Sequence, residues 1–206
     1  MSVVVLISGR GSNMQAILEA GIPVSAVISN MPGAKGLEIA ARHGVATRIV
    51  AHQDFASREA FDAALAAEVD RHAPKLVALA GFMRILTPAF VERYAARLVN
   101  IHPSLLPAFP GLDTHARALA AGVKLHGCTV HYVSADLDHG PIIVQAAVPV
   151  KPDDTEETLA ARVLRQEHVA YPRAIRWFLD GRLVIANGVV RVKGSDARQI
   201  LVSGLE

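Results

Sequence analysis

Two polar side chains near the middle of the chain are of types that could stabilise a negative charge and, for the histidine, move a proton. Asn100 and His102 lie two positions apart in the apolar run 98–102, which predicts a strand. Side chains at positions i and i+2 of a strand share a face, so the amide and the imidazole are expected to project together. Such a pair could stabilise an oxyanion and shuttle a proton, and Pro103 would end the strand there. A histidine at a strand end can also be purely structural, so both interpretations stay open.

An acidic loop supplies a possible partner for that histidine. Asp136 and Asp138 lie just before Gly140 and Pro141, a pair that marks a turn. A carboxylate that reached His102 would orient the ring and keep the imidazolium available as an acid. The two acids could equally be solvated loop residues, because the sequence cannot show the contact.

A glycine-rich segment, Gly-Arg-Gly-Ser-Asn at 9–13, follows an apolar run that predicts a strand. Glycines let a ligand approach the backbone, and free N–H groups at the start of the next helix attract an anion. Met14 stands where a dinucleotide motif has its third glycine, and the lysine of a P-loop is missing. Asn30 stands where an acid would hold a dinucleotide ribose. The segment predicts a site for one phosphate, or simply a strand–helix turn that needs glycine.

The segment 80–86, Ala-Gly-Phe-Met-Arg-Ile-Leu, is an apolar loop that leaves a buried strand. Apolar side chains with exposed backbone amides would suit a flat heteroaromatic ligand. Packing in the protein core would explain the same composition.

All four segments fall at one place in the predicted architecture. Apolar strands alternate with helical segments, which is typical of a mostly parallel α/β sheet, and ligands of such sheets bind beyond the carboxyl ends of the strands. We expect an open, Rossmann-like sheet with helices on both faces and antiparallel additions toward the C-terminus. The predicted strands are 3–7, 24–29, 45–50, 76–80, 98–102, 127–133 and 142–148, with a hairpin at 183–192. The predicted helices are 14–20, 36–43, 57–72, 87–97, 114–121 and 153–179, the first capped by Ser12 or Asn13.

Composition excludes several classes of protein. The chain has 206 residues, of which 51% are hydrophobic and 19% charged, with a net charge of +2, so it is expected to be one globular domain and not disordered. No apolar run is long enough for a membrane span, and the first residues lack the basic region of a signal peptide. The single cysteine suits the cytoplasm. No block of Lys and Arg predicts a nucleic-acid partner.

The remaining histidines and the cysteine do not predict a metal site. His126 and His131 would point to opposite faces of one strand, and His168 stands in a predicted helix. The sequence has no H-E-x-x-H motif, so a zinc site is not expected. Cys128 falls within a strand pattern, where it is expected to be a small core residue and a poor nucleophile.

The four segments together resemble those of a known family. The motifs Gly9-Arg10-Gly11-Ser12-Asn13, Ala80 to Leu86, Asn100-Ile101-His102-Pro103-Ser104-Leu105-Leu106-Pro107 and Leu137 to Pro141 occur in the order found in the folate-dependent formyltransferase superfamily. The first motif resembles that of the glycinamide ribonucleotide transformylases (phosphoribosylglycinamide formyltransferases) of purine biosynthesis. The resemblance runs from about residue 3 to residue 183.

The resemblance implies a reaction. The amine of glycinamide ribonucleotide would attack the formyl carbon of 10-formyltetrahydrofolate, the co-substrate, without a metal or a covalent enzyme intermediate. Asn100 and protonated His102 would stabilise the tetrahedral oxyanion. Asp138 would hold the imidazolium and assist transfer of a proton from the amine to the leaving folate nitrogen.

The resemblance also implies binding roles. Gly11, Ser12 and Asn13 would hold the phosphate of the ribonucleotide, and Glu167 its ribose. The folate would be bound by side chains and backbone groups from three parts of the chain: Arg58; Met83, Arg84, Ile85 and Leu86; and Asn100 with Ser134, Ala135, Asp136, Leu137 and Asp138. Three positions depart from the family pattern, namely Leu164 for a polar residue, His139 for a glycine, and the pair Cys128-Thr129 for two hydroxyl residues.

Two alternatives share parts of this pattern. A formyltetrahydrofolate deformylase gives the formyl group to water but carries an N-terminal domain, for which a first strand at residue 3 is expected to leave no room. A non-catalytic nucleotide- or folate-binding module could use the same fold. We expect a single domain over 1–206, with a phosphate-binding half at 1–100, a folate and catalytic half at 101–180 and a hairpin and tail at 181–206. The expected state is a monomer or homodimer with small-molecule substrates and no nucleic-acid or membrane partner.

Overall fold

The computed structural model describes residues 2–194 and 199–203. The chain forms two compact units, one ending at Asn100 and the other beginning at Ile101. The strand β5 (Leu98–His102) therefore begins in the first unit and ends in the second. Within the described residues, no helix is long and apolar enough to cross a membrane.

The first unit contains a parallel sheet built from the predicted strands. Its order is β3-β2-β1-β4-β5, with β1 at the centre pairing to β2 on one side and to β4 on the other. All five residues of β1 are fully buried, as expected for a β-branched run covered on both faces. Besides β5, the strands of this sheet are β1 (Val3–Ile7), β2 (Val24–Ser29), β3 (Ala46–Ile49) and β4 (Leu76–Leu79).

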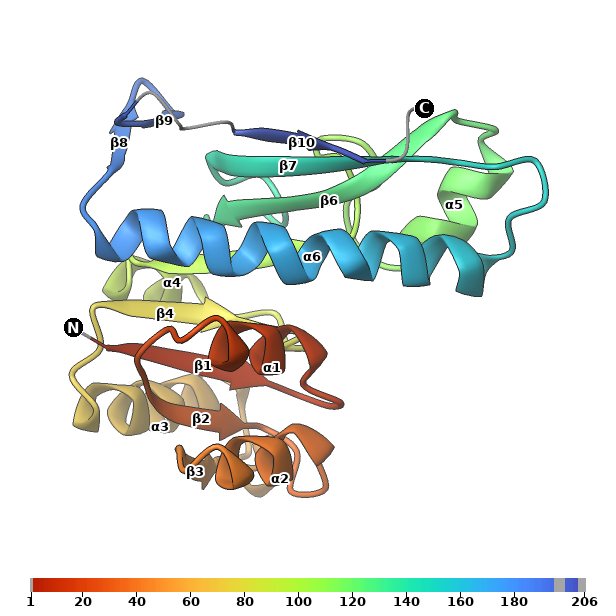
Figure 1. Ribbon diagram of the computed structural model, residues 1–206. Helices are drawn as coiled ribbons and strands as arrows, with labels where there is room; N and C mark the ends of the chain where they lie inside the picture. Colours follow the sequence, from red (N-terminus) through yellow and green to blue (C-terminus); the bar gives the residue numbers. More distant parts are fainter. Residues whose placement is uncertain (1, 195–198, 204–206) are drawn as a thin grey trace. The chain divides into compact units, whose positions relative to one another are not determined.

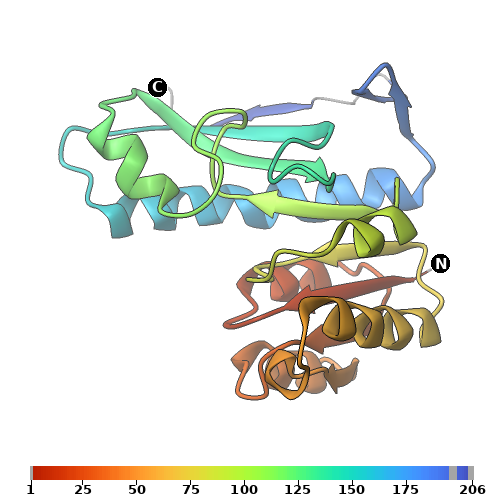
Figure 2. The ribbon, with the colours of Figure 1, turned by 180° about the vertical axis from the view of Figure 1, so that it is seen from behind.

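Helices cover both faces of this sheet, which confirms the prediction for the first unit. α1 and α2 lie on one face (Figure 1), and α3 lies on the opposite face, nearest the viewer in Figure 2. Two of the helices begin at side-chain caps: the Ser57 hydroxyl accepts from the Ala60 amide, and the Thr87 hydroxyl from the Phe90 amide. The elements are α1 (Ser12–Glu19), α2 (Lys35–Arg42), the 3₁₀ helix η1 (His52–Asp54), α3 (Arg58–Arg71) and α4 (Pro88–Arg93).

The second unit is built on an antiparallel strand pair. β6 (Leu125–Tyr132) pairs with β7 (Ile142–Pro149), and β10 (Ile200–Val202) pairs with β7 in parallel. The long helix α6 (Glu156–Leu179) packs along β6 and β7, and α5 (Thr114–Ala120) contacts α6 (Figure 1). A separate hairpin joins β8 (Leu183–Ala186) to β9 (Val189–Val192). The strands of the chain are thus mostly parallel with antiparallel additions, as predicted.

Two local predictions were wrong, and one strand was not predicted. The N-cap of α1 is Gly11, in a left-handed conformation without a side-chain cap, and not Ser12 or Asn13. α4 ends at Arg93 rather than at residue 97, because the chain turns through Ala96 with φ of 58° before β5. β10 was not predicted, since three residues are too few for a recognisable alternation.

Candidate active site

A cavity of about 280 Å³ opens in the first unit at the carboxyl ends of β1 and β4. This is the edge at which ligands of parallel sheets bind. The glycine-rich segment and the apolar loop predicted from sequence both contribute to its wall. The lining residues are Ser8, Gly9, Arg10, Gly11, Ser12, Asn13, Ala80, Gly81 and Met83.

Gly11 brings the start of α1 to this cavity. Its φ is +77°, and a Cβ added to it would lie 2.7 Å from the Cα of Gly36, so neither the conformation nor the space suits another residue. The amide of Gly36 donates to the carbonyl of Gly9 at 3.0 Å, which ties the loop to the first turn of α2. Because the first N–H groups of a helix have no partner within it, the backbone at Ser12 and Asn13 can bind an anion.

The segment after β4 lies beside the same cavity. The side chains of Met83 and Ile85 are 64% and 63% exposed, so this loop presents apolar surface to solvent. Arg84 lies over the ring of buried Phe61, with 5.9 Å from its guanidinium carbon to the ring centroid, while Leu86 is half-buried. The interpretation of the segment as core packing was therefore wrong for Met83 and Ile85. Arg58 is exposed at the first position of α3.

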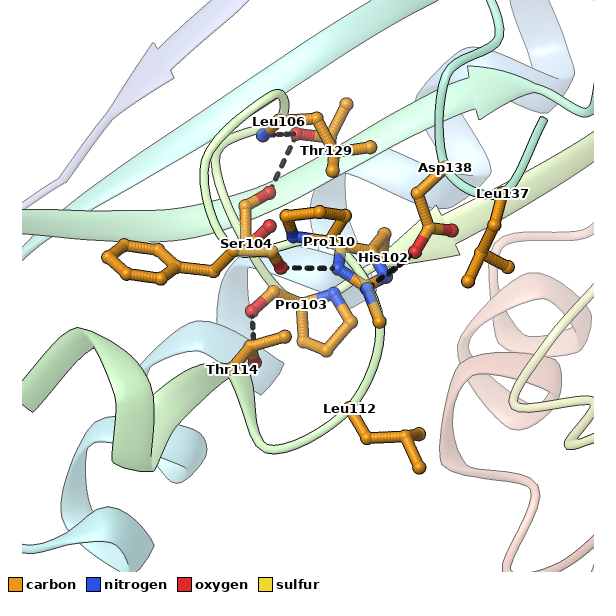
Figure 3. Close-up of polar contacts among 12 residues, drawn as sticks. His102, Pro103, Ser104, Leu106, Pro110, Leu112, Thr114, Thr129, Leu137 and Asp138 are labelled. Carbon is orange, nitrogen blue, oxygen red and sulfur yellow. Dashed lines mark hydrogen bonds and ion pairs between the residues drawn. The ribbon is translucent and has the colours of Figure 1, made fainter.

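The second unit brings His102 and Asp138 together (Figure 3). The Nδ1 atom of His102 lies 3.5 Å from Oδ2 of Asp138, and each side chain is only 8% exposed. Nε2 of His102 lies 3.0 Å from the carbonyl oxygen of Phe109. Both ring nitrogens therefore face oxygen acceptors, and only the imidazolium can donate to both. The 3.5 Å separation between Nδ1 and Oδ2 is longer than a usual N–H···O hydrogen bond, so Nδ1 can also bond a ligand oxygen.

Asp138 is held in place by the backbone of two loops. Its Oδ2 atom also accepts from the amide of Gly111 at 2.9 Å. Its own backbone is left-handed, with φ of 56°, in the connection between β6 and β7. The loop can close there because Gly140 has no side chain: a Cβ at this position would collide with the carbonyl of Tyr132. The solvated interpretation of Asp138 was wrong, whereas Asp136 is exposed.

The rest of that loop supports the turn. The Ser134 hydroxyl donates to the carbonyl of Asp136 at 3.0 Å, and a ring nitrogen of His139 lies 2.8 Å from the carbonyl of Leu137. The His139 departure from the family pattern therefore adds a contact within the loop. Ala135 and Leu137 are exposed, the latter by 55%.

A buried hydroxyl fixes the loop that follows His102. Thr129 of β6 accepts from the amide of Leu106 and donates to the carbonyl of Ser104, at 3.0 and 2.7 Å (Figure 3). Gln145 of β7 donates to both Thr129 and the Leu106 carbonyl. Thr129, which belongs to the pair that departs from the family pattern but itself carries a hydroxyl, thus anchors the segment that follows the imidazole.

Three groups around the pair His102 and Asp138 were not predicted from the sequence. The carbonyl of Phe109 and the amide of Gly111 are backbone atoms, which leave no mark in residue types. His131 was set aside, yet its Nε2 atom lies 3.9 Å from Oδ1 of Asp138. Burial lowers the pKa of His131, and its Nδ1 atom lies 2.9 Å from the Tyr132 carbonyl. His131 lies two residues after Thr129 in β6, so alternation places both side chains on one face of the strand. This spacing was the signal in the sequence that could have identified His131.

Asn100, Glu167 and Cys128 were also singled out from the sequence. Asn100 is half-buried in β5, where alternation places it on the same strand face as His102. Glu167 is 7% exposed within α6. Cys128 is fully buried in β6, where burial and then the charge of Glu167 raise the pKa of its thiol, so it is a poor nucleophile as predicted. In the part of the chain that the structure describes, no three His, Cys, Asp or Glu side chains are grouped to hold a metal ion.

The chain is similar to several characterised proteins. It is 54% identical over 189 residues to a phosphoribosylglycinamide formyltransferase of Escherichia coli, with 89% of each chain covered. A solved structure of a phosphoribosylglycinamide formyltransferase from Coxiella burnetii superposes with a TM-score of 0.92 at 47% identity, covering 98% of this chain and 99% of that one. The trifunctional purine biosynthetic protein adenosine-3 of Drosophila melanogaster is 49% identical over 192 residues, 89% of this chain but only 14% of that protein.

A solved formyltetrahydrofolate deformylase from Pseudomonas syringae has the same fold but lower sequence identity. Its TM-score is 0.86 at 29% identity, and the match covers 94% of this chain and 66% of that one. The sequence also matches the formyl transferase family over residues 1–175, which is most of the chain. The chain therefore belongs to the formyl transferase family.

Proposed function

We propose that the chain transfers the formyl group of 10-formyltetrahydrofolate to the amine of glycinamide ribonucleotide, a step of purine biosynthesis. The observation that carries the proposal is the His102 ring held between the Asp138 carboxylate and the Phe109 carbonyl, two residues after Asn100 in β5. A protonated His102 ring, with the Asn100 amide on the same strand face, would present two hydrogen-bond donors. Such donors stabilise the oxyanion of an acyl transfer.

The reaction consists of one addition and one elimination. The amine nitrogen of glycinamide ribonucleotide bonds to the formyl carbon, and the carbonyl electron pair moves to oxygen. The Nδ1–H of His102 and the amide of Asn100 stabilise that oxyanion, while Asp138 stabilises the imidazolium. The oxyanion then collapses, the bond from carbon to the folate nitrogen breaks, and the amine proton passes to that nitrogen through water held at Asp138. The products are a formamide and tetrahydrofolate.

Binding roles are part of the same proposal. The cavity at Gly11, Ser12 and Asn13 is of a size and polarity suited to the phosphate of the ribonucleotide. Glu167 would bind the ribose hydroxyls.

The folate would contact groups from several segments. The backbone of Arg84 and Leu86 would recognise the pterin edge, and the exposed apolar side chains of Met83 and Ile85 would cover the ring. The remaining contacts would come from Arg58, Asn100, Ser134, Ala135, Asp136, Leu137 and Asp138.

The cellular setting and the oligomeric state complete the proposal. The lone cysteine, which is buried and free, suits the reducing cytoplasm. We propose a monomer or homodimer, which sedimentation of the purified protein at several concentrations would test.

The experiment that tests the function compares two reactions of the purified protein. Loss of the formyl group from 10-formyltetrahydrofolate is followed by absorbance, with and without glycinamide ribonucleotide, and the formamide product is identified by mass spectrometry. Turnover that requires the amine supports the proposal. Equal turnover without it would indicate the deformylase, which is the less supported alternative given its lower identity to this chain. No turnover in either reaction would indicate a binding module.

A further inference from the structure

The segment between β4 and α4 has no regular secondary structure, yet it is fastened at both ends by side chains. The amide of Met83 donates to the hydroxyl of Ser8 at 2.8 Å. The amide of Thr87 donates to Oδ2 of Asp62 in α3 at 2.6 Å. Between these two bonds lie residues 84–86, whose backbone is free of any helix or strand. Two side-chain acceptors therefore hold the ends of a short irregular segment.

A hydrogen bond to Asn30 orients the Ser8 hydroxyl that accepts from Met83. The Ser8 hydroxyl donates its proton to Oδ1 of Asn30, which leaves an oxygen lone pair for the Met83 amide. Asn30 is 2% exposed, and its side-chain amide lies 3.1 Å from a ring nitrogen of His52. The amide of Ser8 also donates to the carbonyl of Gly81. A buried polar chain thus fixes the first end of the segment.

Burying Asp62 lowers the folding free energy that its hydrogen bond to Thr87 could contribute. Asp62 is 3% exposed, and within the described residues its second oxygen, Oδ1, has no hydrogen-bond partner. A buried carboxylate with an unsatisfied oxygen costs folding free energy. A second link already joins α3 to the end of α4, because Asp70 accepts from Arg93 and from the Tyr94 hydroxyl. Asp62 therefore is not needed to join the two helices. Its hydrogen bond goes to the Thr87 amide, where the irregular segment ends.

We propose that Asp62 and Ser8 are positioning residues that set the affinity for the formylfolate by holding segment 83–87 in its binding conformation. The inference rests on the proposed function, in which the backbone of residues 84–86 meets the pterin. Without these two bonds the segment would sample other conformations, and apparent affinity falls in proportion to the fraction that is competent to bind. Asp62 acts only through the Thr87 amide and touches no ligand.

The test compares three variants of α3. Asp62→Ala removes the acceptor, whereas Asp62→Asn keeps an oxygen for the Thr87 amide. Asp70→Ala is the matched control, since it removes an acidic link between α3 and α4 that lies away from segment 83–87. Asp62→Ala is expected to raise the KM for the formylfolate about 10- to 100-fold, the loss typical of a hydrogen bond to a charged group, with kcat and the KM for the ribonucleotide within about threefold. Asp62→Asn should recover most of this loss, and Asp70→Ala should lower Tm without changing either KM.

Two measurements keep the inference separate from the proposed reaction. Calorimetry with 10-formyltetrahydrofolate alone should show the same loss of affinity as the KM. Hydrogen exchange of the amides of Met83 and Thr87 in the free protein should accelerate in Asp62→Ala but not in Asp70→Ala. If the wild-type protein binds the formylfolate but formylates no amine, the proposed formyl transfer is refuted. The role of Asp62 and Ser8 would then still be decided by the affinity for the formylfolate and by the hydrogen exchange of the Met83 and Thr87 amides.

Specific outcomes would overturn the inference. Equal changes in both KM values, a fall in kcat with an unchanged folate KM, or exchange at Thr87 equal to that of the wild type would each show a merely structural role for Asp62. If Asp62→Ala does not fold, Ser8→Ala takes its place, with faster exchange at Met83 and weaker formylfolate binding expected. Unchanged exchange and binding in Ser8→Ala would contradict the proposal in the same way.

Discussion

Replacing Asp138 by asparagine removes one negative charge next to the imidazole and changes little else. The two side chains have the same shape, and an amide oxygen can still accept from the Gly111 amide. Asparagine also tolerates the left-handed backbone at this position, where φ is 56°. The substitution therefore tests the charge of Asp138 rather than the fold of its loop.

The expected loss of activity follows from the geometry. Unit charges 3.5 Å apart attract by about 1 kcal/mol at the dielectric constant of water and by about 5 kcal/mol at an effective value near 20. Both side chains are 8% exposed, so the pair lies toward the larger figure. We expect kcat to fall about 100- to 1,000-fold, equivalent to about 3–4 kcal/mol of transition-state stabilisation.

The assay measures kcat and both KM values for formyl transfer to glycinamide ribonucleotide, with Tm recorded for each variant. Asp153→Asn is the matched control, because it removes the same charge from an exposed position outside this loop and outside the proposed binding residues. The control should stay within about threefold of the wild type. If Asp138→Asn folds normally and keeps its kcat within that range, the ion pair with His102 does not support catalysis and the proposed mechanism is wrong.

Three further substitutions, one of them with a control, test the cavity, the loop and one buried histidine. Gly11→Ala should weaken binding of glycinamide ribonucleotide about tenfold or more in calorimetry, because the added methyl would lie 2.7 Å from Gly36 Cα; normal binding would exclude a role for this turn. Gly140→Ala should lower both kcat and Tm, since its methyl would collide with the Tyr132 carbonyl, whereas Gly33→Ala, with open space around it, should change neither. Burial, and then the charge of His115, lowers the pKa of His126 to about 4, so the unfolded chain takes up a proton near pH 6.5 before the folded chain does. This histidine should cost up to about 3 kcal/mol of stability as the pH falls from 6.5 to 4, and His126→Leu should flatten the pH dependence of urea unfolding over that range; an unchanged slope would contradict this assignment.

The ion pair illustrates how far sequence reasoning reaches at the site. Residue type and spacing identified His102 and Asp138 as candidates, and Pro103 placed the histidine at a strand end. The contact depends on the β6–β7 connection closing at Gly140, where only the absence of a Cβ permits the approach to Tyr132. No local pattern encodes that approach. The same holds for the backbone groups of Phe109 and Gly111, which complete the surroundings of the pair.

The boundaries of helices and strands were also predicted where local residue patterns set them and missed where long-range contacts or backbone turns did. Apolar alternation and capping residues predicted the strands of the first unit and the helices that begin after Ser57 and Thr87. The end of α4 was missed because the left-handed turn at Ala96 is not favoured by its residue type. β10 was missed because its pairing with β7 is a long-range contact of only three residues.

The sequence by itself determined the class of fold, the family and the side chains able to do the chemistry, because periodicity, turn residues and short motifs act locally along the chain. Only the tertiary structure decided which of those side chains meet. It brought Asp138 to His102, directed His131 at the same carboxylate and fastened segment 83–87 to Ser8 and Asp62. These contacts join residues distant in sequence, and their geometry depends on packing and backbone hydrogen bonds that residue types alone do not specify.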